Sequence, residues 1–363
     1  MRLTIGTGLL GLSLTTAACL QPVGGGDCVG ERCGDMVDAG TTVAKCADDS
    51  KVTELATNTV IRTLADFDKL PKGCWALNAN LRIEGQAITS LAKLGDLIEV
   101  NDLELVDTGL VTIDSKQPFN VYGSLLLSGN TKLTSFSNLA VKRWEGSTTG
   151  GAFSVTYNVR NNPLLASVDA LKYVQKVDVD LRFTDNPKLA AISLDELTTV
   201  NGAIVIANTG APSIGFSQLT HVARVEITGN TALTTVRGFG ATSIGGDFIL
   251  RGNPKLAQLG TMSSLTTISG ALVVDDNDSL VDLAGLTGTM QRVSGAVTIT
   301  GNATLTGLGS LSHATAIGAG SITNNAALTY CKAIEVDHCV PNSTVTISGN
   351  MNTTTNCTCW CGL

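Results

Sequence analysis

The chain has 363 residues, of which 43% are hydrophobic, and it carries a net charge of −7. This length and hydrophobicity can supply a large buried core, which argues against an intrinsically disordered protein. Glycine is abundant (39 residues) and aromatic residues are scarce (4%), which favours short strands and tight turns over packed helices. No basic patch with interleaved aromatic residues occurs, so nucleic acid is not an expected partner.

The N-terminal residues 1–18 read as a signal peptide, because Arg2 precedes an apolar stretch too short to span a membrane, and the stretch ends in small residues. The sequence "TAAC" that ends this segment resembles the processing site of bacterial lipoproteins, which makes Cys19 the expected lipid-attachment residue. Thr16 stands where that site usually has Leu, so ordinary cleavage after Ala18 is the alternative. We therefore expect an exported protein at the bacterial outer membrane or cell surface, held by a lipid anchor alone, or else secreted.

The other cysteines lie near the two ends of the chain. Export implies an oxidising compartment, where cysteines are predominantly disulfide-bonded. The tail "CTCWCGL" could instead bind a thiophilic metal, but closely spaced cysteines without histidines are more typical of disulfides. With Cys19 lipidated, an odd number is left and one of them lacks a partner within the chain. The disulfide candidates are Cys28, Cys33, Cys46, Cys74, Cys331, Cys339, Cys357, Cys359 and Cys361.

Between these ends one short phrase recurs, as in "LLLSGNTKL", "FILRGNPKL" and "VTITGNATL". Aligned on its Asn, it returns about every 24 residues, a period typical of solenoids, in which each coil buries its apolar face against its neighbours. The aligned positions are Gln86, Thr108, Asn130, Asn162, Asn186, Thr209, Asn230, Asn253, Asn277, Asn302, Asn325 and Asn350. The pattern predicts an all-β, right-handed parallel β-solenoid of about twelve coils.

Within each repeat, the third and fifth residues before the aligned position are apolar, while the second and fourth vary freely. This alternation predicts one strand per coil, with one face in the core. A Gly often stands seven residues before the Asn, as at Gly202 and Gly270, and indicates a second turn where a side chain would clash or φ is positive. The Leu three residues after the Asn is expected to point into the core.

The polar run Asp275, Asp276, Asn277 and Asp278 could be a metal site, a carboxylate pair or a structural device. Because Asn277 occupies the repeated position and the calcium-loop spacings are absent, the repeat favours a structural role. We predict an asparagine ladder that satisfies the backbone at the turn of each coil, since an unpaired buried backbone group costs roughly 1–3 kcal/mol. The ladder residues are Asn130, Asn162, Asn186, Asn230, Asn253, Asn277, Asn302 and Asn325.

The pattern V-x-G-x-L-x-I-x-x-N-x-x-L, seen in "ISGALVVDDNDSL" and "VSGAVTITGNATL", resembles the receptor L-domain family. The resemblance covers about residues 75–350 and implies a leucine-rich-repeat-like β-solenoid of the bacterial-envelope kind. It implies no enzyme activity, no catalytic residues and no cofactor. The chain departs from the receptors in having no cysteine-rich module between two L-domains, so hormone binding is not implied.

Five segments follow from these patterns. Residues 1–18 are the signal peptide and 19–45 a Gly-rich tether, followed by an N-terminal cap over 46–80. The β-solenoid covers 81–350, and a Cys-rich C-terminal cap over 329–363 overlaps its last coils. Caps are required because terminal coils would otherwise expose strand edges and core.

The expected function is non-catalytic binding or adhesion, with a protein or a cell-surface glycan as partner. A stripe of apolar residues with a charged rim on the outward sheet face is typical of an interface. Alternatively, another segment covers the stripe, or these residues merely favour strands. A long insertion, the 141–153 loop, carries an aromatic residue among charges, which can be a binding platform or can pack on the solenoid. The candidate binding residues are Leu126, Val205, Ile249, Val273, Arg251, Trp144, Lys142 and Arg143.

Two other functions are possible for a solenoid of this kind. A carbohydrate-active β-helix enzyme, a hydrolase or lyase, requires carboxylates clustered on adjacent coils, and Asp178, Asp180 and Asp185 share one coil instead. An ice-binding solenoid requires unbroken rows of Thr. Thr298, Thr300, Thr323 and Thr346 begin such rows, but Arg251, Glu226 and Arg182 interrupt them.

Overall fold

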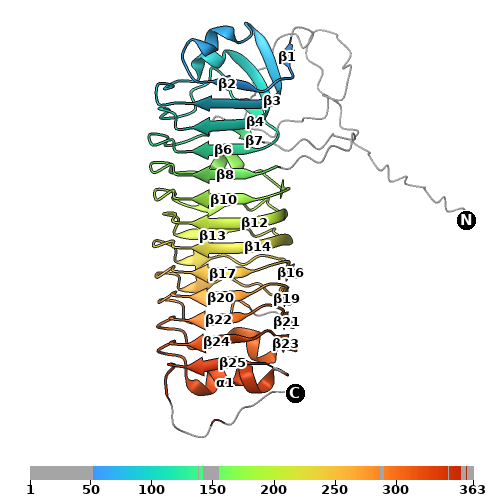
Figure 1. Ribbon diagram of the computed structural model, residues 1–363, viewed down its shortest axis with the longest axis vertical. Coiled ribbons are helices and arrows are strands. Elements are labelled where there is room, and N and C mark those ends of the chain that lie inside the picture. Colours follow the sequence, from blue (N-terminus) through green and yellow to red (C-terminus); the bar gives the residue numbers. More distant parts are fainter. Residues whose placement is uncertain are drawn as a thin grey trace, which may run out of the picture. The chain divides into compact units, whose positions relative to one another are not determined.

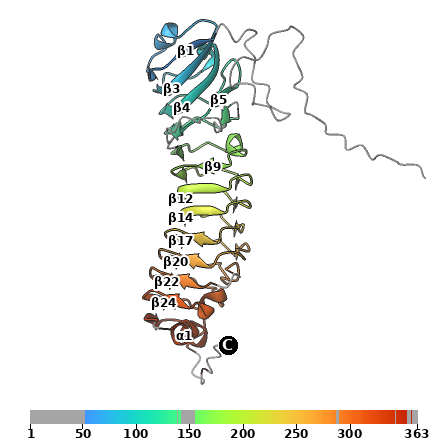
Figure 2. The ribbon, with the colours of Figure 1, turned by 90° about the vertical axis from the view of Figure 1, so that its right-hand side faces the viewer.

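The computed structural model describes residues 52–137, 139–141, 155–286, 290–341, 343–352 and 357. All of them belong to one compact unit, Thr41–Leu363. The fold is the predicted parallel β-solenoid of about twelve coils. Figure 1 shows the strands stacked as rungs, and Figure 2 shows the same coils turned by 90°.

The principal strands of the coils pair in parallel and form one long column of the large sheet. From β3 to β22, each presents its third and fifth residues before the aligned position to the core, in the alternation that the sequence predicts. The main strands are β2 (Thr59–Ile61), β3 (Cys74–Glu84), β4 (Asp96–Val106), β6 (Leu125–Ser128), β8 (Tyr157–Arg160), β10 (Leu181–Thr184), β12 (Thr199–Ala207), β14 (His221–Thr228), β17 (Phe248–Arg251), β20 (Leu272–Asp275), β22 (Val297–Thr300), β24 (Gly320–Thr323) and β25 (Val345–Ser348).

The expectation of one strand per coil was incomplete, because the sheet continues past a corner into a second strand segment. In β3, β4, β12 and β14 the two segments form one long strand. In the other coils the second segment is a separate short strand. These are β1 (Thr53–Leu55), β5 (Phe119–Val121), β7 (Leu139–Val141), β9 (Lys176–Val177), β16 (Ser243–Ile244), β19 (Thr267–Ile268), β21 (Arg292–Val293) and β23 (Ala316–Ile317).

The corner between the segments explains the recurring Gly. A Cβ on Gly202 would lie 2.1 Å from the carbonyl oxygen of Val179 and 2.5 Å from Oδ1 of Asp180, both in the preceding coil. The same Oδ1 accepts a hydrogen bond from the backbone N–H of Ala203 at 2.7 Å. Of the two explanations that the sequence left open, the close approach of the neighbouring coil holds at this position, and φ is not positive there.

The buried asparagine side chains form the predicted ladder. Nδ2 of Asn277 donates to the carbonyl oxygens of Leu250 (3.0 Å), in the preceding coil, and Asp275 (3.1 Å), in its own coil. Its Oδ1 accepts from the backbone N–H and from Nδ2 of Asn253, at 3.2 and 3.1 Å. Each asparagine thus forms hydrogen bonds with backbone groups of its own coil and of the adjoining coil. All eight predicted ladder residues are fully buried. At Thr108 and Thr209 a hydroxyl donates to the next Asn instead.

The residue immediately before each aligned position has the left-handed backbone conformation. Asp276, with φ of 52°, is one of them, which accounts for its place in the polar run. Only Gly, Asn and Asp occur there, the residue types that tolerate positive φ at least cost. The set is Gly85, Asp107, Gly129, Asn161, Asp185, Asn208, Gly229, Gly252, Asp276, Gly301, Asn324 and Gly349.

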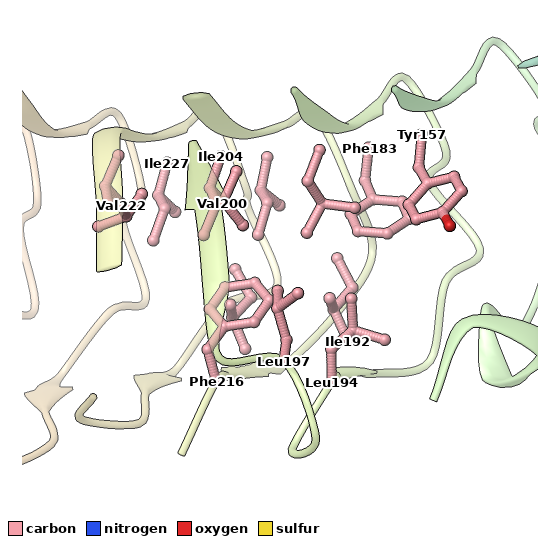
Figure 3. Close-up of a cluster of buried hydrophobic side chains, with 14 of the residues drawn as sticks. Tyr157, Phe183, Ile192, Leu194, Leu197, Val200, Ile204, Phe216, Val222 and Ile227 are labelled. Atoms are coloured by element: carbon pink, nitrogen blue, oxygen red, sulfur yellow. The ribbon is translucent and has the colours of Figure 1, made fainter. Parts of the chain in front are cut away.

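The core lies between the main strands and the opposite wall of each coil. In Figure 3, Tyr157, Phe183 and Ile204 project from the main strands towards Ile192 and Phe216 on that wall. The Leu three residues after each ladder Asn is also buried, as predicted; these residues are Leu133, Leu165, Leu189, Leu233, Leu256, Leu280, Leu305 and Leu328.

The opposite wall carries less regular structure. A second parallel sheet of four short strands lies there, made of β11 (Ile192–Ser193), β13 (Ser213–Gly215), β15 (Thr235–Val236) and β18 (Gln258–Leu259). Short 3₁₀ helices occur at Asp66–Lys69, Ala92–Leu94, Asp169–Leu171 and Gly309–His313.

The C-terminal end is closed by an element that the strand pattern does not predict, the helix α1 (Tyr330–Cys339). The Thr329 hydroxyl caps its N-terminus by accepting from the backbone N–H of Lys332, and α1 buries Ala333 and Val336. Figure 2 shows α1 beyond β24 at the end of the stack. A disulfide joins Cys331 in α1 to Cys357, so the predicted covalent staple is present here.

At the other end the sheet begins earlier than the solenoid boundary predicted at residue 81. Strands β1 and β2 pair with β3, so residues of the expected N-terminal cap already form the first coil. Cys74 and Cys339 are disulfide-bonded as well. Trp75 is fully buried in this first part of the core, and its Nε1 donates to the carbonyl oxygen of Leu94 at 2.8 Å.

Candidate binding face

The face of the main strands turned away from the core presents side chains in straight columns, because every coil pairs with the next in the same register. The "middle column" holds the residue four before each aligned position: Arg82, Glu104, Leu126, Asn158, Arg182, Val205, Glu226, Ile249, Val273, Thr298, Ser321 and Thr346. The "turn column", two residues further along, includes Glu84, Val106, Ser128, Arg160, Arg251, Asp275, Thr300, Thr323 and Ser348.

The predicted apolar residues do lie in one column, but they do not form a continuous stripe. Ile249 pairs directly with Val273. Leu126 is separated from Val205 by the coils that carry Asn158 and Arg182. Val205 itself is buried, with 7% of its surface exposed, so it offers little area to a partner. The usable apolar area is therefore divided between Leu126 and the pair Ile249 and Val273.

Charged residues of the face pair with one another along the solenoid axis. In the first coils Arg82 forms ion pairs with Glu84 and with Glu104, and Glu84 also meets Arg62. The hydrogen bond from Arg82, followed by that from Arg62, holds the pKa of the Glu84 carboxyl below its usual range, and the two glutamates raise the pKa of Arg82. These pairs link three consecutive coils.

In the middle coils two ion pairs each lie within one coil, and a third joins neighbouring coils. Arg182 meets Asp180 at 2.7 Å, Arg224 meets Glu226 at 2.9 Å, and Arg251 meets Asp275 at 2.9 Å. Asp275, from the polar run, is therefore an ion-pair partner.

Asp180 forms an ion pair and also accepts a hydrogen bond from the backbone at the corner of the next coil. Burial alone would raise the pKa of its carboxyl, but the hydrogen bonds from the backbone N–H of Ala203 and from Arg182 outweigh it and hold the pKa below the ordinary value. Asp102 and Asp247 stand at the same corner of their coils and accept from the backbone N–H of Ser124 and Ala271.

The last coils of the face are uncharged and rich in hydroxyl groups. Thr298 pairs with Ser321 and then Thr346, while Thr300 pairs with Thr323 and then Ser348. The hydroxyls of Thr300 and Thr323 are hydrogen-bonded at 2.9 Å. The Thr rows expected for an ice-binding surface thus extend over the final coils and end at the ion pair of Arg251 and Asp275.

A hollow of about 310 Å³ lies on this face over β3, β4, β6 and β8. Its lining includes Leu126, the one predicted binding residue found there, together with Asp102, Glu104 and Asn158. The other lining residues were not recognised from the sequence, because the alternation within a single strand does not show which outward side chains border a hollow. The signal that could have found them is the register: they occupy matching positions in consecutive repeats.

Several predicted residues lie outside the described residues: Trp144, Lys142 and Arg143 of the inserted loop, the lipid-attachment candidate Cys19, and Cys28, Cys33, Cys46, Cys359 and Cys361. Over the described ranges, no group of three or more His, Cys, Asp and Glu is arranged to hold a metal ion. Within the same ranges, no helix is both long and apolar enough to cross a bilayer. Comparison of the chain with protein-family models and with solved structures finds no match.

Proposed function

We propose that this protein is a non-catalytic binding module of the bacterial envelope, which uses the outward face of its main strands to hold a protein or a glycan. The observation that carries the proposal is the construction of that face. Its side chains stand in columns on a backbone whose turns are locked by the buried ladder, and its charges are paired between coils. Sites built on rigid elements need little ordering when a partner arrives.

The state of the carboxylates favours binding over hydrolysis. A glycosidase uses a pair of carboxyl groups, one of them with a raised pKa. On this face Glu84, Glu104 and Asp180 each meet an arginine, and the pKa shifts of Glu84 and Asp180 are downward. Such groups stay ionised and engaged, which suits recognition of a partner.

The test is the binding of the full chain to isolated envelopes of the source organism. In the face variant Ile249→Asp with Val273→Asp, two charges replace the adjacent apolar pair, and we expect affinity to fall at least about tenfold. The matched control is Leu164→Asp with Val281→Asp, since these apolar residues are 45% and 49% exposed and lie outside both columns. Equal binding by the two variants would show that the face is not the interface.

The envelope location is tested separately by protease treatment of intact cells. Release of solenoid peptides, with periplasmic marker proteins retained, supports a lipid-anchored protein on the cell surface. Protection of the solenoid would instead favour a position inside the envelope. A Cys19→Ser variant found in the soluble fraction would support the lipid anchor.

A further inference from the structure

The hollow over β3, β4, β6 and β8 is formed by residues from four consecutive coils. Asn80 pairs with Asp102 in the sheet register, and Leu126 pairs with Glu104 on one side and with Asn158 on the other. Leu126 is half-buried in the middle of this set. The hollow thus has an aliphatic floor with polar side chains around it.

The polar groups around the hollow are mostly hydrogen-bond acceptors held in place by their neighbours. The Asp102 carboxylate is fixed by the backbone N–H of Ser124, at 2.6 Å from Oδ1. Glu104 accepts from Nδ2 of Asn80 at 2.7 Å and from Arg82. With its amide nitrogen so engaged, Asn80 has a buried Oδ1 that finds no donor among the described residues. This oxygen lies below the surface and is closed to a ligand, so the acceptors that the hollow offers are the carboxylates of Asp102 and Glu104.

The charge and the size of the hollow narrow the ligand class. Two carboxylates disfavour an anionic ligand, and Arg82 already pairs with Glu104, so of the two carboxylates Asp102 is left to attract a cation. Apolar C–H faces suit Leu126, while hydroxyl groups can donate to Asp102 and Glu104 and can both donate to and accept from Asn158. The volume of about 310 Å³ lies at the lower end of the roughly 300–1,000 Å³ of small-ligand sites, which suits one or two rings.

We propose that this hollow binds a terminal sugar ring, or a pair of rings, of a neutral glycan. The inference rests on the proposed binding function and assigns a ligand class to one part of the face. The ring lies over Leu126, and its hydroxyls donate to the carboxylates of Asp102 and Glu104. Asn158 borders the ring on the next coil and sets its orientation.

The test is calorimetric titration of the full chain with maltose, cellobiose and N,N′-diacetylchitobiose. We expect saturable binding of at least one disaccharide, and binding about tenfold weaker in Asn158→Ala and in Leu126→Ala, since each removes one contact of the ring. Thr298→Ala, at the same register position of the middle column, and Leu164→Ala, outside both columns, are the matched controls, and they should bind as the native chain does. If Leu126→Ala lowers the melting temperature, Asn158→Ala decides, because it removes no core side chain.

Two results would overturn the proposal: no saturable heat from any of the three sugars at about 10 mM, well above a millimolar dissociation constant, or undiminished binding by Asn158→Ala. The envelope-binding assay separates this failure from that of the proposed function. If Ile249→Asp with Val273→Asp abolishes envelope binding while the native chain binds none of the three sugars, the face is an interface and the glycan assignment alone is wrong.

Discussion

At the residue scale, the protein repeats three interlocking devices: a buried amide, a left-handed turn residue and a corner where two coils nearly touch. Each device satisfies a backbone group that stacking would otherwise leave unpaired in the dry interior. Asn253 accepts from the backbone N–H of Asn230 and donates to the carbonyl oxygen of Ile227, so one side chain serves two neighbouring segments.

The ladder predicts that truncation of a single asparagine side chain strongly lowers the free energy of unfolding. Asn253→Ala leaves a backbone N–H and a carbonyl group buried and unpaired, so we expect the free energy of unfolding to fall by about 3 kcal/mol. Urea unfolding followed by circular dichroism measures it. Thr298→Ala, on the outward face, should change the same quantity by less than about 0.5 kcal/mol. A similar, small effect of both substitutions would mean that the ladder is not energetically important.

The close approach of two coils at the corner predicts that replacement by alanine destabilises one glycine position much more than another glycine position nearby in the fold pattern. Gly202→Ala forces a methyl group against backbone at 2.1 Å and should cost about 2–3 kcal/mol. Gly245→Ala meets its nearest atom at 3.5 Å, an ordinary contact, and should be close to neutral. Thermal melting of the two variants makes the comparison. Equal melting temperatures would contradict the close approach of coils at Gly202.

The lowered pKa of Asp180 predicts loss of stability in acid. A carboxyl with a lower pKa in the folded state stabilises the fold above its unfolded pKa, and this stabilisation disappears as pH falls through the folded value. The melting temperature should therefore be nearly constant from neutral pH to about 5 and should decline below about pH 4. Asp180→Asn keeps an oxygen for Ala203 but no charge, so its decline should be shallower.

Asp68→Asn is the control for this experiment. Its side chain is 73% exposed and, among the described residues, its carboxyl forms an ion pair with Lys93 at 3.6 Å, so the variant should reproduce the acid behaviour of the native chain. If Asp180→Asn and the native chain lose stability over the same pH range by the same amount, Asp180 does not contribute to acid sensitivity.

At the scale of single elements, the end of the solenoid depends on α1 and its covalent link. The disulfide between Cys331 and Cys357 spans a sequence separation of 26, for which restriction of the unfolded chain contributes about 3 kcal/mol. Replacing Cys331 and Cys357 by Ser should loosen the start of α1 on the last coil, because the packing of Ala333 and Val336 and the disulfide of Cys339 at the other end of the helix then hold it. Hydrogen exchange should become faster in β25, while β10 and β12 keep their protection.

Unchanged exchange in β25 after removal of both cysteines would show that this disulfide is not needed to secure this end. Faster exchange throughout the solenoid would show instead that the cap supports the whole stack. The predicted result, a local change, follows from the contact of each coil with its neighbours only.

At the scale of the whole molecule, the repeat predicts that complete coils are interchangeable. The interval from Asn230 to Asn253 is 23 residues, so deletion of 231–253 joins Asn230 to Pro254 and restores a ladder Asn followed by its usual turn. We expect a cooperatively folded protein with a lower urea midpoint, because one set of coil interfaces is lost. Deletion of 231–241 removes only part of the coil and shifts the register, which should abolish cooperative unfolding. Comparable behaviour of the two deletions would contradict a strictly registered stack.

Much of this architecture was predictable from the sequence because it is local and repeated. The inward residues, the ladder asparagines and the left-handed turn at Asp276 recur at a fixed period, so each coil confirms the alignment of the others. The helix α1 was missed because it breaks that period, and no neighbouring repeat shares its pattern. The second strand segment was missed because its inward positions are few in each coil.

The candidate binding face shows what only the tertiary structure could decide. The sequence identified which residues point outward, since alternation follows from the strand itself. Which of them stand side by side depends on pairing between coils, so Leu126 joins Asn158 and Glu104 in a hollow, while Val205 is buried among longer neighbours. Alternation along one strand determines whether a side chain points inward or outward, whereas pairing between strands determines which side chains lie beside it. Only the folded stack therefore brings residues that are distant in the sequence into one site.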